Sequence, residues 1–353
     1  MEEVRVGIVG TGSIGMVHLA TYQRLPGYAV TAVCDIDKVA LDRAHEKSGA
    51  KAFADYHDLV ERRDVDLVAV CVPNYLHAAV AIGGLEAGKH IFVEKPIGMS
   101  ADEARAMIAA RDRSGKLLQV GVCQRFRGDS QVLKAHILAG ELGHVYFGKC
   151  GYLRRSGIPG MGGWFTTAAQ SGGGPIVDLG VHALDLTMWL MGNFRPASVS
   201  SCGYAEFGPR GLGGGDWGQS VPGGTFDVED LAAALITFED GATVFLEVSW
   251  AAHVGAGRFY STLMGDKGGI DLDPPTIYTD EFGRPVDKRL SAPEVDAYAA
   301  EHRHFLQCIA AGTPPMPNAE EALAVQAVLD GIRASAKAKG ASVPVVLGST
   351  VAR

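Results

Sequence analysis

The chain has 353 residues, enough for about two domains with cores of their own. Hydrophobic residues make up 47% of it and charged residues 20%, as in soluble globular proteins, so long disordered regions are not expected. With 32 basic and 40 acidic residues the formal net charge is −8, which provides no net basic field to hold nucleic acid or an anionic membrane. Composition therefore favours a small-molecule partner, with no nucleic acid and no membrane.

The cysteine pattern indicates a reducing compartment. The six cysteines form no CxxC pair, and several fall in apolar runs typical of strands, so we interpret them as reduced core residues. There is no run of 18 apolar residues, and the first residues lead almost directly into a strand without the layout of a signal peptide. We therefore expect a cytoplasmic protein.

The beginning of the chain predicts a strand, a glycine turn and a helix. Residues 4–9 (VRVGIV) are rich in β-formers, GTGSIG follows, and MVHLATYQRL has a helical pattern. A second predicted strand, AVTAVCDID, carries Asp35, 20 residues after Gly15. This spacing fits the dinucleotide-binding fingerprint and is improbable for a turn with a purely structural role.

In that fingerprint each glycine has its own role. Gly10 allows the tight turn, Gly12 lets the pyrophosphate approach, and Gly15 lets the helix pack on the strand, while the helix N–H groups hold the diphosphate. Asp35 can accept hydrogen bonds from the ribose hydroxyls of NAD and would repel the 2′-phosphate of NADP, so NAD is favoured; the alternative role, capping the next helix, suits Asp37 better. The expected cofactor-binding residues here are Gly10, Gly12, Ser13, Ile14, Gly15 and Asp35.

Two further strands, 66–72 and 90–93, continue the β-α alternation and predict a Rossmann-type, doubly wound parallel sheet over residues 1–122. Ligands of such sheets bind beyond the carboxyl ends of the strands. Two segments leave strand ends there, PNYLH and EKP. We expect their residues near the nicotinamide: Pro73, Asn74, His77, Glu94 and Lys95.

GTGSIG, the aspartate at the end of the second strand, PNYLH and above all AGKHIFVEKP resemble the glucose-fructose oxidoreductase, inositol dehydrogenase and rhizopine-catabolism (Gfo/Idh/MocA) family. Two amphipathic helices near the end of the chain match the closing helices of this family, so the resemblance extends over essentially the whole sequence.

Residues 123–353 change to one helix, several long strands with glycine-rich connections, and two helices. This order predicts an α+β domain with a mostly antiparallel sheet for substrate binding and oligomerisation. The strands are apolar on more than one side, so we expect helices on one sheet face and a second subunit on the other, in a homodimer or homotetramer.

The segment SGGGPIVDLGVHALDLTMWLMG (171–192) concentrates polar residues on an otherwise apolar helix. At α-helical spacing Asp178, His182 and Asp185 share one face. From the residues alone, three interpretations stay open: an internal hydrogen-bond network, a metal site, or an acid/base histidine oriented by a carboxylate. No companion ligand motif supports a metal, and none is expected.

The family resemblance favours the third interpretation. It implies that Lys95, Asp178 and His182 form the catalytic set, with Asp185 near substrate hydroxyls. His182 would take the hydroxyl proton, Lys95 would stabilise the developing alkoxide, and Asp178 would orient the histidine.

Other residues suit a polyhydroxylated substrate. Arg125 stands where the family more usually has a double arginine, but here Gln124 precedes it. Aromatic and basic side chains in YLRRSGIPGMGGWF suit sugar stacking and hydroxyl binding, or equally a subunit interface. The glycine-rich segment 208–224 could form a lid or an interface arm. The expected substrate residues, besides Asp185, are Arg125, Tyr152, Arg155, Trp164 and His253.

The resemblance thus implies an NAD-dependent oxidoreductase that transfers hydride between the nicotinamide and a secondary hydroxyl or ketone of a sugar, glycoside or cyclitol. One alternative is a redox-assisted glycosidase of the same family, in which bound NAD oxidises the sugar only transiently. The other is a non-catalytic dinucleotide-binding regulator, which is ranked last because Lys95 and His182 are both present.

Overall fold

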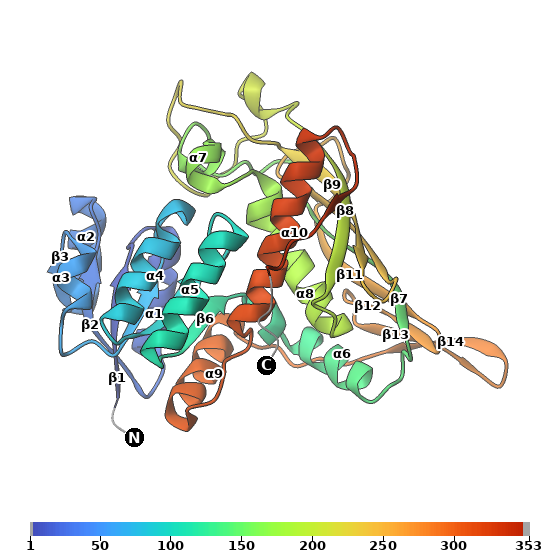
Figure 1. Cartoon of the computed structure of the whole chain (residues 1–353), viewed down its shortest axis with the longest axis horizontal. Coiled ribbons are helices and arrows are strands. Elements are labelled where there is room, and N and C mark those ends of the chain that lie inside the picture. The colour runs from blue at the N-terminus through green and yellow to red at the C-terminus, as the bar shows by residue number, and fades with distance from the viewer. Residues whose placement is uncertain (1–2, 349–353) are drawn as a thin grey trace. The chain divides into compact units, whose positions relative to one another are not determined.

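The computed structural model describes residues 3–348, which fold into two compact units (Figure 1). The first contains residues 3–123 together with Asp296–Leu323, and the second contains Gln124–Val295 and residues 324–348. The first division falls one residue after the expected boundary at 122. Residues 296–323, by contrast, pack with the first unit although the sequence placed them in the second domain.

The first unit is built on a six-stranded parallel sheet with the strand order β3-β2-β1-β4-β5-β6, the order of a dinucleotide-binding Rossmann fold. This confirms the predicted doubly wound sheet. Its strands are β1 (Val4–Val9), β2 (Tyr28–Cys34), β3 (Lys51–Phe53), β4 (Leu67–Val70), β5 (His90–Glu94) and β6 (Leu118–Gly121). Its helices are α1 (Ser13–Arg24), α2 (Lys38–Ser48), α3 (Tyr56–Val60), α4 (His77–Glu86), α5 (Ala101–Ser114) and α9 (Ala297–Ala311).

Continuous apolar runs explain why the central strands lie inside this unit. Every residue of β4 and four of the five in β5 are buried, as expected where helices cover both faces of a parallel sheet. Helix α9 contributes Ala299, Phe305 and Cys308 to the core that also holds Val6 and Leu19. Burial of this apolar face, about 25 cal/mol for each Å², attaches α9 to the first unit despite its distance in sequence.

The second unit contains a nine-stranded, mostly antiparallel sheet with the order β14-β13-β12-β11-β7-β10-β9-β8-β15, in which β7 and β10 pair in parallel. This confirms the predicted α+β architecture. Its strands are β7 (Val145–Leu153), β8 (Pro196–Tyr204), β9 (Leu231–Phe238), β10 (Thr243–Ser249), β11 (Arg258–Gly265), β12 (Gly268–Asp271), β13 (Thr276–Glu281), β14 (Arg284–Arg289) and β15 (Val343–Pro344). Its helices are α6 (Gly128–Leu138), α7 (Ala168–Ser171), α8 (Val181–Met191) and most of α10 (Ala319–Lys337).

Helices α8 and α10 cover one face of this sheet. Val244, Leu246 and Val248 alternate along β10 and pack with Leu184 of α8 and Val328 of α10 in one buried cluster. Immediately before α8 the chain makes a π-helical turn, Ile176–Gly180. Such a turn holds an extra residue, so the residues before and after it do not keep the α-helical spacing expected from the sequence.

Within residues 3–348, the structure has no helix with the length and apolar character needed to cross a membrane.

The glycine turn provides a matched test of the packing. A Cβ on Gly15 would lie 2.0 Å from the carbonyl oxygen of Gly10, whereas a Cβ on Gly12 would meet no atom within 4 Å. We expect Gly15→Ala to lower the free energy of unfolding by about 1–3 kcal/mol, because a main-chain oxygen cannot move aside. Gly12→Ala should change it by less than about 1 kcal/mol. Urea unfolding followed by circular dichroism measures both, and equal stability of the two variants would contradict this packing.

Candidate active site

The three glycines after β1 differ in what surrounds them. Gly10 has a positive φ of 90°, and a Cβ there would lie 2.5 Å from the carbonyl oxygen of Cys71. Gly10 and Gly15 are therefore required by the packing of the protein itself. Gly12 meets no such restriction, and the space in front of it is open. Because packing does not require a glycine at position 12, the small size of Gly12 suits the close approach of a ligand to the main chain, as the fingerprint requires for a pyrophosphate.

Asp35 points toward this glycine turn. Its Oδ2 accepts hydrogen bonds from the Thr11 N–H (2.6 Å) and the Thr11 hydroxyl (3.0 Å), and its Oδ1 accepts one from the Asp37 N–H (2.9 Å). Arg43 donates to the Thr11 carbonyl oxygen (3.1 Å), which holds a guanidinium at the same turn. The helix-capping role expected for Asp37 is also present, because its carboxylate accepts from Val39 N and Ala40 N.

Two aliphatic side chains beside Asp35 were missed by the sequence reasoning. Ile36 is 91% exposed and Val39 is 79% exposed. Exposed aliphatic residues next to a strand-end aspartate offer the apolar surface that an adenine ring can cover. Ile36 directly follows the fingerprint aspartate and Val39 lies four residues after it, and this position was the available signal.

The nicotinamide-side candidates differ in burial. Lys95 is half-buried at the carboxyl end of β5. His77 is buried, with Nδ1 2.7 Å from the Pro96 carbonyl oxygen and Nε2 2.9 Å from that of Val72. Burial lowers the pKa of His77 and the two carbonyl groups oppose this shift. His77 therefore joins the loops that follow β4 and β5, and its expected contact with the cofactor finds no support in this geometry.

Glu94 is also directed inward. Its Oε1 lies 2.6 Å from His18 Nε2, and its Oε2 accepts the Lys95 N–H (3.1 Å). Pro73 and Asn74 begin the loop after β4, where Asn74 is 8% exposed. Thus the sequence placed all five residues at the correct edge of the sheet but did not indicate their direction.

In the second unit Asp178 lies in the π-helical turn, and His182 lies in the first turn of α8. The fully buried Trp250 donates from Nε1 to Asp178 Oδ2 (2.9 Å). Glu229 accepts from the N–H groups of Gly174 (3.0 Å) and Ile176 (3.2 Å), which anchors the start of this helical segment. Burial raises the pKa of Glu229, and these hydrogen bonds oppose that shift. Trp250 and Glu229 hydrogen-bond to this segment from distant parts of the sequence, so no helix pattern could identify them.

Asp185 and Arg125 are brought together, but away from solvent. Arg125 Nε donates to Asp185 Oδ2 (2.8 Å) and Arg125 Nη2 to Oδ1 (2.7 Å), with side chains 0% and 2% exposed. The guanidinium also lies over the rings of Trp189 and Phe194. A buried bidentate pair of this kind is a core element, so the expectation that these two residues contact substrate finds no support here.

Of the remaining substrate candidates, Tyr152 and His253 lie near the support of Asp178. Tyr152 and Phe207 pack on a buried cluster that contains Leu179 and Trp250. His253 is exposed with its ring edge against Phe207, with 4.9 Å between centroids. The exposed Arg155 and the half-buried Trp164, which stacks on Phe165 at 3.8 Å, lie on the neighbouring glycine-rich segment.

The segment 208–224 is tied by its main chain to the segment 157–163. Ile158 N–H donates to the Gly213 carbonyl oxygen (2.9 Å), Gly160 N–H to that of Trp217 (2.7 Å), and Val221 N–H to that of Met161 (2.8 Å). Glycines permit this approach, because a Cβ on Gly162 would lie 2.1 Å from the Val221 carbonyl oxygen. In this structure the two segments form a joined pair of loops.

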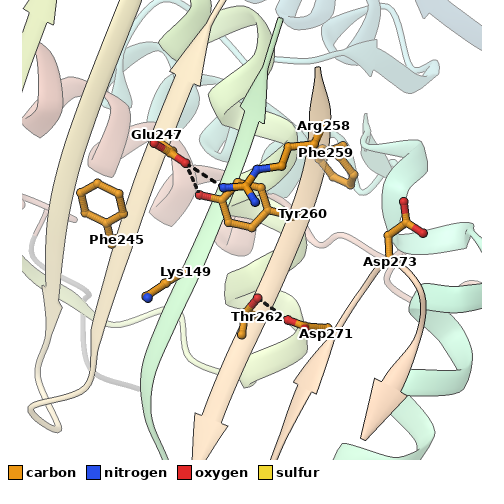
Figure 2. A pocket seen from close by; sticks show the side chains of 9 residues that line it. All are labelled: Lys149, Phe245, Glu247, Arg258, Phe259, Tyr260, Thr262, Asp271 and Asp273. Atoms are coloured by element: carbon orange, nitrogen blue, oxygen red, sulfur yellow. Dashed lines mark hydrogen bonds and ion pairs between the residues drawn. The ribbon is translucent and has the colours of Figure 1, made fainter. Parts of the chain in front are cut away.

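A polar hollow lies on the sheet face of the second unit that is opposite α8 (Figure 2). There Glu247 accepts from Tyr260 (2.8 Å) and Arg258 (3.3 Å), while Thr262 donates to Asp271. Their β-register places these side chains on the opposite face of the sheet from Cys150 and Ser261, which face α8. Among the residues that the structure describes, no group of three or more His, Cys, Asp or Glu side chains is arranged to hold a metal ion.

Comparison with known proteins identifies the family. Residues 4–122 match the oxidoreductase family model with an NAD-binding Rossmann fold, and residues 130–271 match the GFO/IDH/MocA C-terminal domain. The chain is 34% identical over 285 residues to D-glucoside 3-dehydrogenase of Escherichia coli, which covers 79% of this chain and 80% of that protein. It is 28% identical over 323 residues to inositol 2-dehydrogenase of Salmonella typhimurium, with 88% of each chain covered.

Solved structures agree on the fold. A levoglucosan dehydrogenase in complex with NADH superposes with a TM-score of 0.86 at 22% identity, covering 98% of this chain and 100% of that one. The resemblance seen in GTGSIG, PNYLH and AGKHIFVEKP is confirmed: the chain is a member of the Gfo/Idh/MocA oxidoreductases, and its first unit is the NAD-binding Rossmann domain of that family.

Proposed function

We propose that this protein is an NAD-dependent dehydrogenase that oxidises a secondary hydroxyl of a sugar, glycoside or cyclitol, or reduces the matching ketone. The observation that carries the proposal is the 34% identity over most of its length to a D-glucoside 3-dehydrogenase. The inositol 2-dehydrogenase relatives extend the substrate class to cyclitols. The open space before Gly12 and the Asp35 carboxylate at the same turn support a dinucleotide at the first unit.

Within this proposal, each of three residues has a separate chemical task. Bound NAD⁺ supplies the acceptor for the carbon-bound hydrogen, which leaves as hydride. His182 accepts the proton of the reacting hydroxyl, and Asp178, held by Trp250, orients the histidine. Lys95 donates a charge-assisted hydrogen bond to the developing alkoxide. In the reductive direction the same groups return the proton to the ketone oxygen.

Asp185 and Arg125 are left out of the proposed substrate wall because they satisfy each other. Tyr152, Arg155, Trp164 and His253 are kept in it. Tyr152 packs on the cluster that supports Asp178, and His253 contacts Phe207, which packs on the same cluster. Together the four residues combine aromatic faces with hydrogen-bonding groups, which suits a polyhydroxylated ring.

The redox-assisted glycosidase is distinguished by its products. A dehydrogenase releases NADH in proportion to substrate consumed, whereas a glycosidase that returns the hydride releases the aglycone without NADH. A panel of sugars, methyl glycosides and cyclitols, followed by absorbance of NADH and by sugar analysis, separates the two. A protein that binds NAD and converts none of the panel would point to the regulator alternative.

We also propose that the enzyme is cytoplasmic and forms a homodimer or homotetramer through the open sheet face of the second unit. The six cysteines are free thiols, as in a reducing compartment. Leu235 of β9 is 44% exposed on that face and pairs with Phe245 on the neighbouring strand, and Phe245 lines the polar hollow drawn in Figure 2. Aromatic, aliphatic and charged groups of both signs on one face can complement a second copy.

The cofactor preference is the first prediction of this proposal. NAD should bind more tightly than NADP, because Asp35 repels a 2′-phosphate. Asp35→Ser should narrow the difference in affinity between NAD and NADP. Adding Arg43→Ala should remove part of the gain in NADP affinity, because Arg43 then no longer offers a cation at the glycine turn. Calorimetry measures the six affinities, those of NAD and NADP for the unmodified protein and for the two variants. Equal or tighter NADP binding by the unmodified protein would rule this out.

The second prediction concerns catalysis. His182→Asn should leave NAD affinity nearly unchanged and lower kcat by about 10²–10⁴, the usual contribution of general-base catalysis. Lys95→Met should lower kcat by a similar order. Oxidation by the unmodified enzyme should rise with pH as the base histidine loses its proton. Wild-type turnover with an unchanged pH profile in His182→Asn would show that the histidine is only structural.

Assembly gives the third prediction. Sedimentation at micromolar concentration should show a dimer or tetramer, and Leu235→Asp should shift it toward the 37.1 kDa monomer by burying a charge at the interface. Leu138→Asp on α6, where Leu138 is 74% exposed, is the matched control and should have no such effect. A monomeric unmodified protein would end the proposal.

A further inference from the structure

Three buried ionisable side chains form a continuous hydrogen-bond chain inside the first unit, and this hydrogen-bond chain ends beside Lys95. His18 of α1 contacts His302 of α9 through Nδ1 and Nε2 at 2.8 Å. The other nitrogen of His18, Nε2, lies 2.6 Å from Oε1 of Glu94 at the end of β5. The second oxygen of Glu94 accepts the Lys95 N–H at 3.1 Å. Both histidines are fully buried and Glu94 is 8% exposed.

The hydrogen-bond partners determine the proton positions in this chain. Among residues 3–348, no hydrogen-bond partner faces the buried His302 Nδ1. Burying an unpaired N–H there would cost more free energy than burying a lone pair, so the proton is placed on Nε2. His302 Nε2–H then donates to His18 Nδ1, and His18 Nε2–H donates to the Glu94 carboxylate. Burial lowers the pKa of His302 well below its ordinary value, which agrees with a neutral ring. Every donated hydrogen in the chain is thus directed toward Glu94.

Aromatic packing fixes the orientation of the two imidazoles. The His302 ring lies 4.2 Å from the ring of Tyr22 and 4.7 Å from that of Phe92. The His18 ring packs edge-on against Phe92 at 5.0 Å and Tyr298 at 5.6 Å. Rings held on several sides cannot turn away from their hydrogen bonds, so the chain is rigid along its length.

A core of this kind needs no polar residues for stability. Burying a carboxylate is unfavourable unless donors compensate it, and apolar side chains of similar volume usually stabilise a core at least as well. Here the Glu94 carboxylate accepts hydrogen bonds from His18 Nε2–H and from Lys95 N–H. Glu94 directly precedes Lys95 in the sequence. The arrangement fixes the main chain from which the Lys95 side chain extends.

We infer that His18 and His302 are positioning residues that hold Lys95 in its reactive orientation through the carboxylate of Glu94. The inference rests on the proposed role of Lys95 in hydride transfer. A displacement of about 1 Å in a catalytic group can cost about 10² in rate, so a clamp on its backbone has a direct effect on turnover.

The first test measures the clamp without measuring activity. His18→Leu keeps the site apolar but removes the donor to Glu94, whereas His18→Gln retains an N–H at the corresponding position. Hydrogen exchange of the Lys95 amide, followed by mass spectrometry of the peptide that contains it, should accelerate at least several-fold in His18→Leu and return toward wild type in His18→Gln. Unchanged exchange in His18→Leu would overturn the inference.

The second test is kinetic. His18→Leu should lower kcat by about 10–100-fold while the Kd for NAD, measured by calorimetry, changes by less than about twofold. His302→Leu should have a smaller effect in the same direction, because it removes only the outer hydrogen bond. Tyr22→Phe is the control, because it removes a hydroxyl from the same core and leaves the hydrogen bonds among His302, His18 and Glu94 intact. Its kcat should match that of the wild type. Equal losses of kcat in Tyr22→Phe and His18→Leu would mean that any disturbance of this core suffices.

A double-mutant cycle separates failure of this inference from failure of the proposed function. With methyl D-glucoside or myo-inositol as substrate, His18→Leu should add little to the loss already caused by Lys95→Met, because both act on one group. Full additivity would overturn the positioning role while leaving Lys95 catalytic. Wild-type kcat in Lys95→Met would instead refute the catalytic assignment of Lys95, and the positioning role with it. Thermal unfolding of each variant shows whether the comparison is made on folded protein.

Discussion

The approach of two main-chain segments at the glycine turn is the constraint on which the cofactor site depends. Helix α1 lies so close to the end of β1 that no side chain fits at Gly15, and Gly10 must adopt a positive φ beside Cys71. Helix α1 begins directly after Gly12, and the N-terminus of a helix can hold an anion. Asp35 then hydrogen-bonds to Thr11 in the same turn. We therefore propose that the backbone forms the dinucleotide site and that a single carboxylate, that of Asp35, adds the selectivity for NAD.

The second unit solves a different problem, which is to hold polar groups on a helix that is otherwise buried. Trp250 donates a hydrogen bond to Asp178 in the π-helical turn, and Glu229 accepts two from the main chain at the start of this turn. The backbone that carries Asp178 and His182 is therefore held in place. Arg125 neutralises Asp185 one helical turn later. Each polar residue of this segment whose contacts are described thus has a partner from a distant part of the sequence. Sites built on such supported elements keep their geometry during turnover.

Much of the fold and of the candidate cofactor site could be predicted from sequence because their signals are local. GTGSIG, the apolar strands and Asp35 each depend on spacing within about 30 residues, which is the length of one βαβ unit. The placement of Lys95, Glu94 and His77 at the carboxyl end of the sheet followed from the same periodicity. The direction of Glu94 and His77 did not, because it depends on His18 and Pro96, partners that only the folded chain reveals.

The features beyond prediction all involve distant pairs or irregular backbone. Nothing near Asp185 in sequence indicates Arg125, which lies 60 residues away. The π-helical turn inserts a residue that a helical wheel cannot anticipate. Asp178 therefore does not keep the α-helical spacing to His182 and Asp185 that the sequence predicted. The apolar face of α9 was visible as a pattern, but a pattern does not say which sheet the helix will cover, and it covers the first.

The most direct test of the account follows the hydrogen itself. A methyl D-glucoside or myo-inositol carrying deuterium on the carbon that is oxidised should deliver that deuterium to C4 of the nicotinamide, with one labelled NADH for each ketone formed, as nuclear magnetic resonance and mass spectrometry of both products can establish. Ketone formation with unlabelled NADH, or with no NADH at all, would contradict direct hydride transfer between substrate and cofactor.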